Sequence, residues 1–329
     1  MIKILKKFVY EGEFLEIDVQ NQIKQYKFTF FIFLWIFFKK IFRNLYRFFQ
    51  RNLVKPTIRN KFAFIETKII NFFPKKIKYI YDSSDLIDIE YLNKNSSLEI
   101  PDLLSSYQIN DIKEYLKNKK KISIYEKSIN KKMPMEYYAT EDLIKNHEIL
   151  NVINNEKLIK IVRGYFKCDF KLDWIWSWWS YANEKNDSIG PQLFHRDYEC
   201  LNFLKLFIYL TDVDVNDGPH QIIKSSNKID CFYKISRFSD LEVYSKFDKE
   251  SCSTIDGMAG KSFLANTYAI HRGLRPIKKD RLVLCYLLST WPSRRSPKIP
   301  PIKYSEIKKN KDLYLKNKSI FDLFINFKN

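Results

Sequence analysis

The strongest pattern along the chain is a set of apolar and aromatic runs in its second half. They span residues 174–179, 204–210 and 282–288, and each is rich in aromatic or branched aliphatic side chains. Runs of this length and composition, separated by turn residues such as those at 217–219, are typical of buried strands. The pattern therefore predicts a β-sheet core over residues 170–292.

Helical periodicity dominates the region before this core. Ser105 is an N-cap candidate, and apolar residues follow it at positions 109, 112, 115 and 116, which is the spacing of an amphipathic helix. A second helix is expected to begin at Ala139, with two acidic residues in its first turn, and a third at about 147–166. The predicted fold class is mostly β with N-terminal helices (α+β).

The N-terminal region combines an apolar run with a cationic stripe. Residues 28–38 are almost wholly apolar, but a membrane-spanning helix needs about 20 such residues. Arg43, Arg47 and Arg51 recur every four residues in the next segment, and Pro56 is expected to end this helix. Two interpretations stay open for residues 24–55: peripheral contact with an anionic membrane, or packing of the aromatic face on the rest of the protein.

The net charge of +19 is concentrated at the two ends of the chain. Residues 1–61 carry +9 and residues 293–329 carry +7, which leaves +3 for the region between. A nucleic-acid-modifying protein should carry its basic surface beside the site of chemistry, so a nucleic-acid partner is not favoured. The expected regions are a basic aromatic N-terminal region (1–61), a mainly helical buttress (62–169), the core (170–292) and a basic C-terminal tail (293–329).

The number and spacing of the cysteines indicate the redox state of the cellular compartment. The five cysteines are an odd number and form no C-x-x-C pair, which favours neither disulfides nor a zinc site. A reducing, cytoplasmic location is expected, and it becomes peripheral on the cytoplasmic membrane face if residues 24–55 contact lipid.

Candidate metal ligands stand out because the chain has only four histidines. His195 lies two residues before Asp197, so on a strand both side chains would point to one face. His271 offers a third donor, 76 positions further on. Two imidazoles and one carboxylate on one face of an iron leave the opposite face open, as in non-haem Fe(II) oxygenases. The alternative is a strand histidine that hydrogen-bonds a nearby carboxylate.

The two other histidines rank lower as ligands. His220 is a rival for the third position, but a residue that follows Pro219 in a turn need not face the core. His147 falls in the helical region and is interpreted as an ordinary surface or packing residue.

Three further features accompany the ligand spacing: the segment Thr211–Asp214, the turn Asp217–Pro219, and Arg281 ten residues after His271. Together they resemble the phytanoyl-CoA dioxygenase-like family of Fe(II)/2-oxoglutarate-dependent oxygenases, over about residues 100–292. The resemblance implies a double-stranded β-helix, or jelly roll, in the core. It also implies that His195, Asp197 and His271 bind iron and that Arg281 holds the distal carboxylate of 2-oxoglutarate, which a guanidinium matches bidentately.

The sequence departs from the family pattern at two places. Residues 223–227 replace a P-G-S-H segment, and Gly273 stands where a small hydroxyl residue often follows the second histidine. The second departure leaves open how the rest of 2-oxoglutarate is held. Lys205 could help from a neighbouring strand, and the alternative is a solvent-facing lysine at a sheet edge.

The resemblance implies hydroxylation, since Asp197 occupies the position that related halogenases leave for chloride. The expected substrate is a small molecule, a lipid or an envelope-saccharide precursor, with 2-oxoglutarate and O2 as co-substrates. Two alternatives belong to other classes: a nucleic-acid-modifying 2-oxoglutarate oxygenase, which the nearly neutral core disfavours, and a catalytically silent jelly-roll binding protein, which an intact ligand triad disfavours.

Overall fold

The computed structural model describes residues 52–72, 80–126, 131–183, 188–233, 235–291 and 299–327, together with Leu45 and Phe48. The chain divides into two compact units, Met1–Asn52 and Leu53–Asn329. The predictions for residues 28–38, and for most of 24–55, lie outside the described residues. Within the part of the chain that is described, no helix is both long and apolar enough to cross a bilayer.

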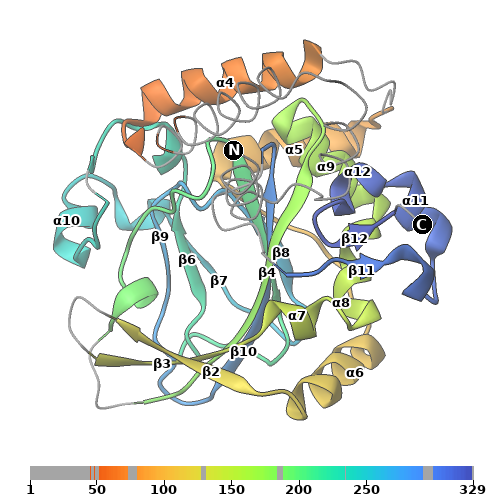
Figure 1. Cartoon of the computed structure of the whole chain (residues 1–329). Coiled ribbons are helices and arrows are strands. Elements are labelled where there is room, and N and C mark those ends of the chain that lie inside the picture. Colours follow the sequence, from red (N-terminus) through yellow and green to blue (C-terminus); the bar gives the residue numbers. More distant parts are fainter. Residues whose placement is uncertain are drawn as a thin grey trace, which may run out of the picture. The chain divides into compact units, whose positions relative to one another are not determined.

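The second unit combines helices with antiparallel sheets (Figure 1). Its largest sheet has seven strands in the order β1-β8-β5-β10-β4-β3-β2, and each neighbouring pair is antiparallel. The strands are β1 (Ser97–Glu99), β2 (Lys121–Glu126), β3 (Lys131–Tyr138), β4 (Lys171–Ser180), β5 (Phe203–Tyr209), β8 (Ser262–Ala265) and β10 (Arg281–Ser289). The three predicted strand runs are confirmed as β4, β5 and β10. Because β10 lies between β5 and β4 and is buried along its whole length, its sequence is a continuous apolar run without alternation.

A smaller sheet carries the second half of the core. Its strands, in the order β7-β6-β9, are β6 (His220–Ile223), β7 (Cys252–Ile255) and β9 (His271–Gly273). The short helix α10 (Asp240–Tyr244) lies between β6 and β7 in the chain. Phe207 and Val283 of the large sheet share one hydrophobic cluster with Ile222 and Ile255 of the small sheet. The two sheets therefore face each other around a common interior.

Helices cover the opposite face of the large sheet. Leu204, Leu206 and Ile208 alternate with the inward-facing residues of β5 and belong to the cluster that includes the helices. The helices with residues in this cluster are α5 (Ser83–Asn95), α6 (Ser106–Lys117), α7 (Thr140–Leu143), α8 (His147–Asn151), α9 (Glu156–Phe166), α11 (Lys311–Lys316) and α12 (Lys318–Phe321). Residues 299–327 thus pack on the core, where Tyr314 and Phe321 are fully buried, and the parallel strands β11 (Ile302–Lys303) and β12 (Ile325–Asn326) join the two ends of this segment.

The helix predictions hold with one correction. Ser105 caps α6, as predicted, through a capping box with Gln108. The single helix expected at about 147–166 is wrong, because a 3-10 turn at Val152–Asn154 separates α8 from α9. The cause is Asn155, whose side chain accepts a hydrogen bond from the backbone N–H of Leu158 and starts a new helix.

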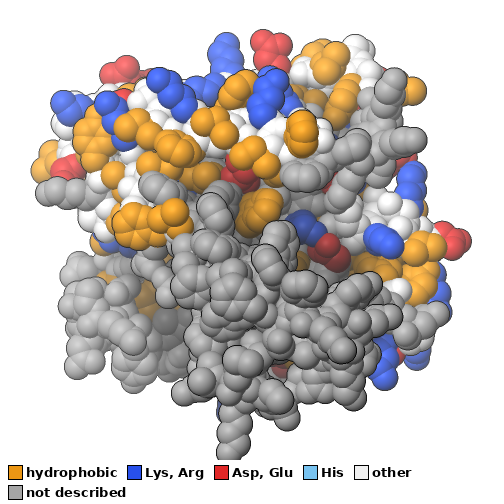
Figure 2. Space-filling view, turned by 45° about the horizontal axis from the view of Figure 1, so that its top comes forward, with side chains coloured by type: hydrophobic (Ala, Val, Ile, Leu, Met, Phe, Trp, Pro, Cys, Tyr) orange, Lys and Arg blue, Asp and Glu red, His pale blue; other side chains and the backbone are white. Residues whose placement is uncertain are grey.

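Pro56 begins a helix of its own. Residues 53–55 are not helical, and Pro56 is the first residue of α4 (Pro56–Phe72), a position where its missing N–H and restricted φ are tolerated. Arg59 anchors α4: its buried guanidinium donates to the carbonyl of Cys200 and lies 4.5 Å from the ring centroid of Tyr268. The other side of α4 is exposed and apolar between lysines (Figure 2), with Ile58, Phe62, Phe64, Ile65, Ile69 and Phe72 at the surface.

Candidate metal centre

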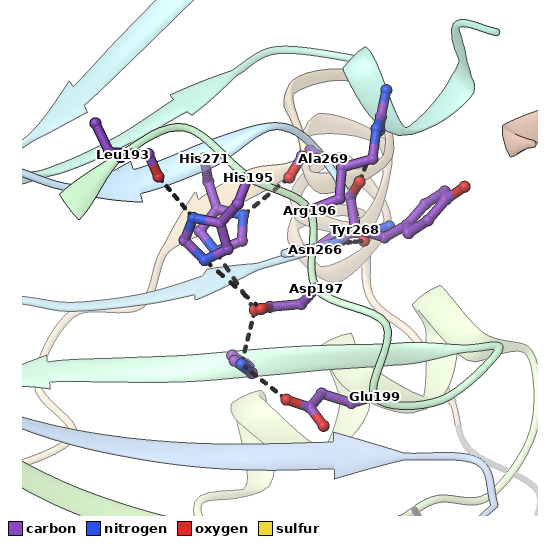
Figure 3. A network of polar contacts seen from close by, with 10 residues as sticks. Leu193, His195, Arg196, Asp197, Glu199, Asn266, Tyr268, Ala269 and His271 are labelled. Atoms are coloured by element: carbon purple, nitrogen blue, oxygen red, sulfur yellow. Dashed lines mark hydrogen bonds and ion pairs between the residues drawn. The ribbon is translucent and has the colours of Figure 1, made fainter. Parts of the chain in front are cut away.

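Pairing of two chain segments brings His195 and His271 side by side. The backbone N–H of each donates to the carbonyl of the other, at 2.9 Å in both directions. Directly paired residues project their side chains from the same face, and the two imidazole centroids are 4.2 Å apart. Asp197 lies two residues beyond His195 and points the same way, whereas Arg196 between them turns away and donates to the carbonyl of Tyr268 at 2.7 Å (Figure 3).

Each imidazole is held in one orientation by the backbone that precedes it. Nδ1 of His195 donates to the carbonyl of Leu193 at 2.8 Å, and Nδ1 of His271 donates to the carbonyl of Ala269 at 2.9 Å. A carbonyl can only accept, so the proton sits on Nδ1 and the lone pair of Nε2 is left for another partner. Both Nε2 atoms are directed at the Asp197 carboxylate (Figure 3).

The spacing of the three donors suits one cation. Nε2 of His195 lies 3.7 Å from Oδ1 of Asp197, and Nε2 of His271 lies 3.4 Å from Oδ2. All three donor atoms lie within 4.8 Å of one another. Donors that each sit about 2.1 Å from one ion are separated by about 3–4 Å. Among the described residues, no other cluster of histidine, cysteine and carboxylate donors has this geometry.

The protonation states also suit a cation. Burial, followed by the neighbouring His271, lowers the pKa of His195 well below its ordinary value, so this imidazole is neutral. Burial alone would raise the pKa of Asp197, but the positive charge of Lys205 outweighs it and holds that pKa well below the usual range. A neutral imidazole and an ionised carboxylate are the forms that bind metals.

Lys205 lies inside the site. Its strand β5 is flanked by β8 and β10, so the expected alternative of an exposed lysine at a sheet edge is wrong. The side chain is 11% exposed, with Nζ 2.7 Å from Oδ2 of Asp197 and 3.8 Å from Oε1 of Glu199. Burial opposes its charge, but the two carboxylates raise the pKa of Lys205 above its ordinary value. Lys205 therefore neutralises the carboxylate of the ligand cluster.

Arg281 is a buried cation that has no anionic partner among the described residues. It is 4% exposed, and its guanidinium donates one long hydrogen bond, from Nη2 to Oγ of Ser180 at 3.4 Å. Its Nε has no hydrogen-bond partner, and no carboxylate of the described residues lies within ion-pair distance. Gly273 lets the guanidinium approach, since a Cβ at that position would lie 3.1 Å from Nη2. Uncompensated buried charge is unfavourable, so an anionic ligand would complete this arrangement.

The remaining histidines are placed differently. His147 begins α8 and lies against Tyr314, with ring centroids 6.3 Å apart. His220, the rival third ligand, does not join the three-donor cluster. It nevertheless stacks on His271, with centroids 5.4 Å apart and rings inclined by 21°. Sequence reasoning identified His220 only as a competing ligand, because the partner strand that turns it inward cannot be read from the chain.

Comparison with known proteins adds information at the level of the fold. No family model and no curated protein sequence matches the chain. The solved structure of SnoN, a non-haem α-ketoglutarate-dependent epimerase from nogalamycin biosynthesis, superimposes with a TM-score of 0.50 at 13% identity, over 63% of this chain and 81% of SnoN. At this identity the likeness concerns the fold alone.

HygX from Streptomyces hygroscopicus, crystallised with nickel and 2-oxoglutarate, gives a TM-score of 0.45 at 15% identity, over 66% of this chain and 91% of HygX. SnoK, a non-haem α-ketoglutarate-dependent carbocyclase, gives 0.45 at 13%, over 64% and 84%. HygX has also been crystallised with iron bound.

Proposed function

We propose that this protein is an Fe(II)/2-oxoglutarate-dependent dioxygenase that hydroxylates a small molecule. One observation carries the proposal: three donors with the spacing of a metal site converge, and the guanidinium of Arg281, which has no anion among the described residues, lies next to Gly273, two residues after His271. A structural ion pair would explain His195 and Asp197, but it would not explain why Arg281 is buried without an anionic partner among the described residues.

The proposed scaffold is the double-stranded β-helix of such oxygenases. Four strands of the large sheet, β4, β10, β5 and β8, face a second layer formed by β7, β6, β9 and the bridged segment at His195. Hydrophobic residues from both layers fill the space between them. The fold shared with SnoN supports this assignment.

The proposed metal ligands are His195, Asp197 and His271. Fe(II) suits this donor set, because two imidazoles and one carboxylate occupy one face of the ion and leave the other accessible. The carbonyls of Leu193 and Ala269 would keep both imidazoles in the orientation that binding needs. When bound, Fe(II) and 2-oxoglutarate supply O2 activation coupled to oxidative decarboxylation of the co-substrate to succinate.

Arg281 is the proposed partner of the distal carboxylate of 2-oxoglutarate. Its guanidinium would then donate two charge-assisted hydrogen bonds to the carboxylate in place of the one long hydrogen bond to Ser180. Asp197 would fill the ligand position that a halide would otherwise need, and this favours hydroxylation. Lys205, through its contact with Asp197, would compensate the charge of that carboxylate until a metal binds, and a direct role in binding 2-oxoglutarate is not supported by its pairing.

The proposed substrate is a small molecule, a lipid or an envelope-saccharide precursor. A nucleic acid is not favoured, since residues 62–292 carry a net charge of only +3. Contact with an anionic membrane through residues 24–55 is retained as part of this proposal, on the strength of the basic and aromatic sequence alone.

The test begins with protein purified without oxygen and loaded with Fe(II). We expect succinate release that depends on 2-oxoglutarate and O2 and that rises with a suitable compound from a metabolite panel. His195→Ala and Asp197→Ala should each lose iron, while the control His147→Ala should retain it. Normal iron content in both ligand variants would contradict the proposal and leave a metal-free binding protein as the better interpretation.

A further inference from the structure

His220 carries an unexplained polar atom at the candidate site. The residue is 5% exposed, and its Nε2 is buried without a hydrogen-bond partner among the described residues. Its ring is surrounded by other rings, with centroid distances of 4.9 Å to Phe207, 5.3 Å to Phe263 and 5.4 Å to His271. Buried polar groups are almost always paired, and an unpaired one is unfavourable. Packing alone would be served better by an apolar side chain.

The backbone fixes where this side chain points. His220 pairs with Gly273 across β6 and β9, and Ile222 pairs with His271 in the same ladder. Paired residues and residues two apart on a strand share a face, so His220 projects on the same side as the ligand His271. The backbone N–H of His220 also donates to the hydroxyl of Tyr209 at 2.9 Å, and that hydroxyl donates to the carbonyl of Ile255 at 2.7 Å. This orientation is therefore held by contacts that do not involve the imidazole.

Gly273 is flanked by His220 and by the guanidinium of Arg281. A Cβ on Gly273 would lie 3.1 Å from Nη2 of Arg281, and His220 pairs with Gly273 on the neighbouring strand, so both groups lie next to this glycine. A neutral imidazole can donate one hydrogen bond through Nε2 to an acceptor held by Arg281.

We propose that His220 binds the distal carboxylate of 2-oxoglutarate together with Arg281, through a hydrogen bond from Nε2. The inference rests on the proposed function and names the second contact of the same ligand. Arg281 supplies the charge, and His220 satisfies a carboxylate lone pair that Arg281 leaves open. Gly273 provides the space between them.

The test uses the full chain loaded with Mn(II), which supports binding without turnover, and measures 2-oxoglutarate binding by calorimetry. Three proteins are compared: wild type, His220→Leu, and His220→Gln, whose amide nitrogen can reach the position of the imidazole Nε2. We expect His220→Leu to bind 2-oxoglutarate about 10- to 100-fold more weakly, the effect of a lost hydrogen bond to a charged group. His220→Gln should stay close to wild type.

Two controls separate this role from a structural one. Pyruvate has the keto acid but no distal carboxylate, so its binding should be the same in all three proteins. Without ligand, His220→Leu should be as stable as wild type or more stable, because it removes an unsatisfied buried group.

The assignment would be overturned if His220→Leu bound 2-oxoglutarate with wild-type affinity. It would also be overturned if the variant lost affinity equally for pyruvate and 2-oxoglutarate, or if His220→Gln bound 2-oxoglutarate as weakly as His220→Leu. Failure of wild-type, Mn(II)-loaded protein to bind 2-oxoglutarate would instead overturn the proposed function, and this assignment with it.

Discussion

The variant Lys205→Met tests whether the lysine compensates the charge of Asp197 when no metal is bound. Nζ of Lys205 lies 2.7 Å from Oδ2 of Asp197, and the two side chains are 11% and 17% exposed. At an effective dielectric constant of about 20, the attraction is about 6 kcal/mol. Since desolvation offsets part of it, removing one partner of a buried pair is expected to lower the free energy of unfolding by about 3–5 kcal/mol.

This loss should depend on the metal. A bound divalent ion compensates the charge of Asp197 in place of Lys205, so Mn(II) should restore most of the stability of Lys205→Met. By linkage, the variant should also bind Mn(II) more tightly than wild type, about tenfold for each 1.4 kcal/mol recovered.

The assay is urea unfolding followed by circular dichroism, with a chelator and with saturating Mn(II). Lys261→Met is the matched control, because Lys261 pairs with the exposed Glu99 and should contribute about 0–1 kcal/mol in either condition. An equal loss with and without Mn(II), or weaker Mn(II) binding by Lys205→Met, would refute this reasoning and show that Lys205 positions Asp197 for the metal.

The remaining predictions concern the co-substrate, the core and the N-terminal segment. Arg281→Met should raise the 2-oxoglutarate concentration needed for half-maximal succinate release by about 10- to 100-fold with iron content unchanged, and an unchanged requirement would indicate another clamp. Leu284→Ala, a fully buried position in the central strand β10, should lower the free energy of unfolding by about 2–5 kcal/mol in urea titrations. Replacing Arg43, Arg47 and Arg51 by Glu should reduce sedimentation with anionic vesicles while succinate release persists, and undiminished sedimentation would contradict the membrane interpretation.

Local properties of the chain were sufficient to predict much of the core. The strands β4, β5 and β10 follow from the composition of short apolar runs, because strand propensity and burial act over a few residues. The common direction of His195 and Asp197 follows from the period of two along an extended backbone. The helix after Ser105 follows from its cap and its spacing.

Contacts between distant segments could be decided only by the tertiary structure. The pairing of His195 with His271, and of His220 with Gly273, depends on which strands become neighbours, and no local pattern encodes that choice. The same holds for Lys205, whose place in a central strand turns an apparent surface charge into the partner of a buried carboxylate.

The sequence by itself therefore determined which residue types could hold a metal and on which kind of element they lie. Within the part of the chain that the structure describes, only the fold decided which donors meet, which histidine is left with an unpaired nitrogen, and that the guanidinium of Arg281 is enclosed without an anion. The physical reason is that secondary structure depends on neighbours along the chain, whereas a binding site depends on sheet pairing and burial, which involve residues far apart in sequence.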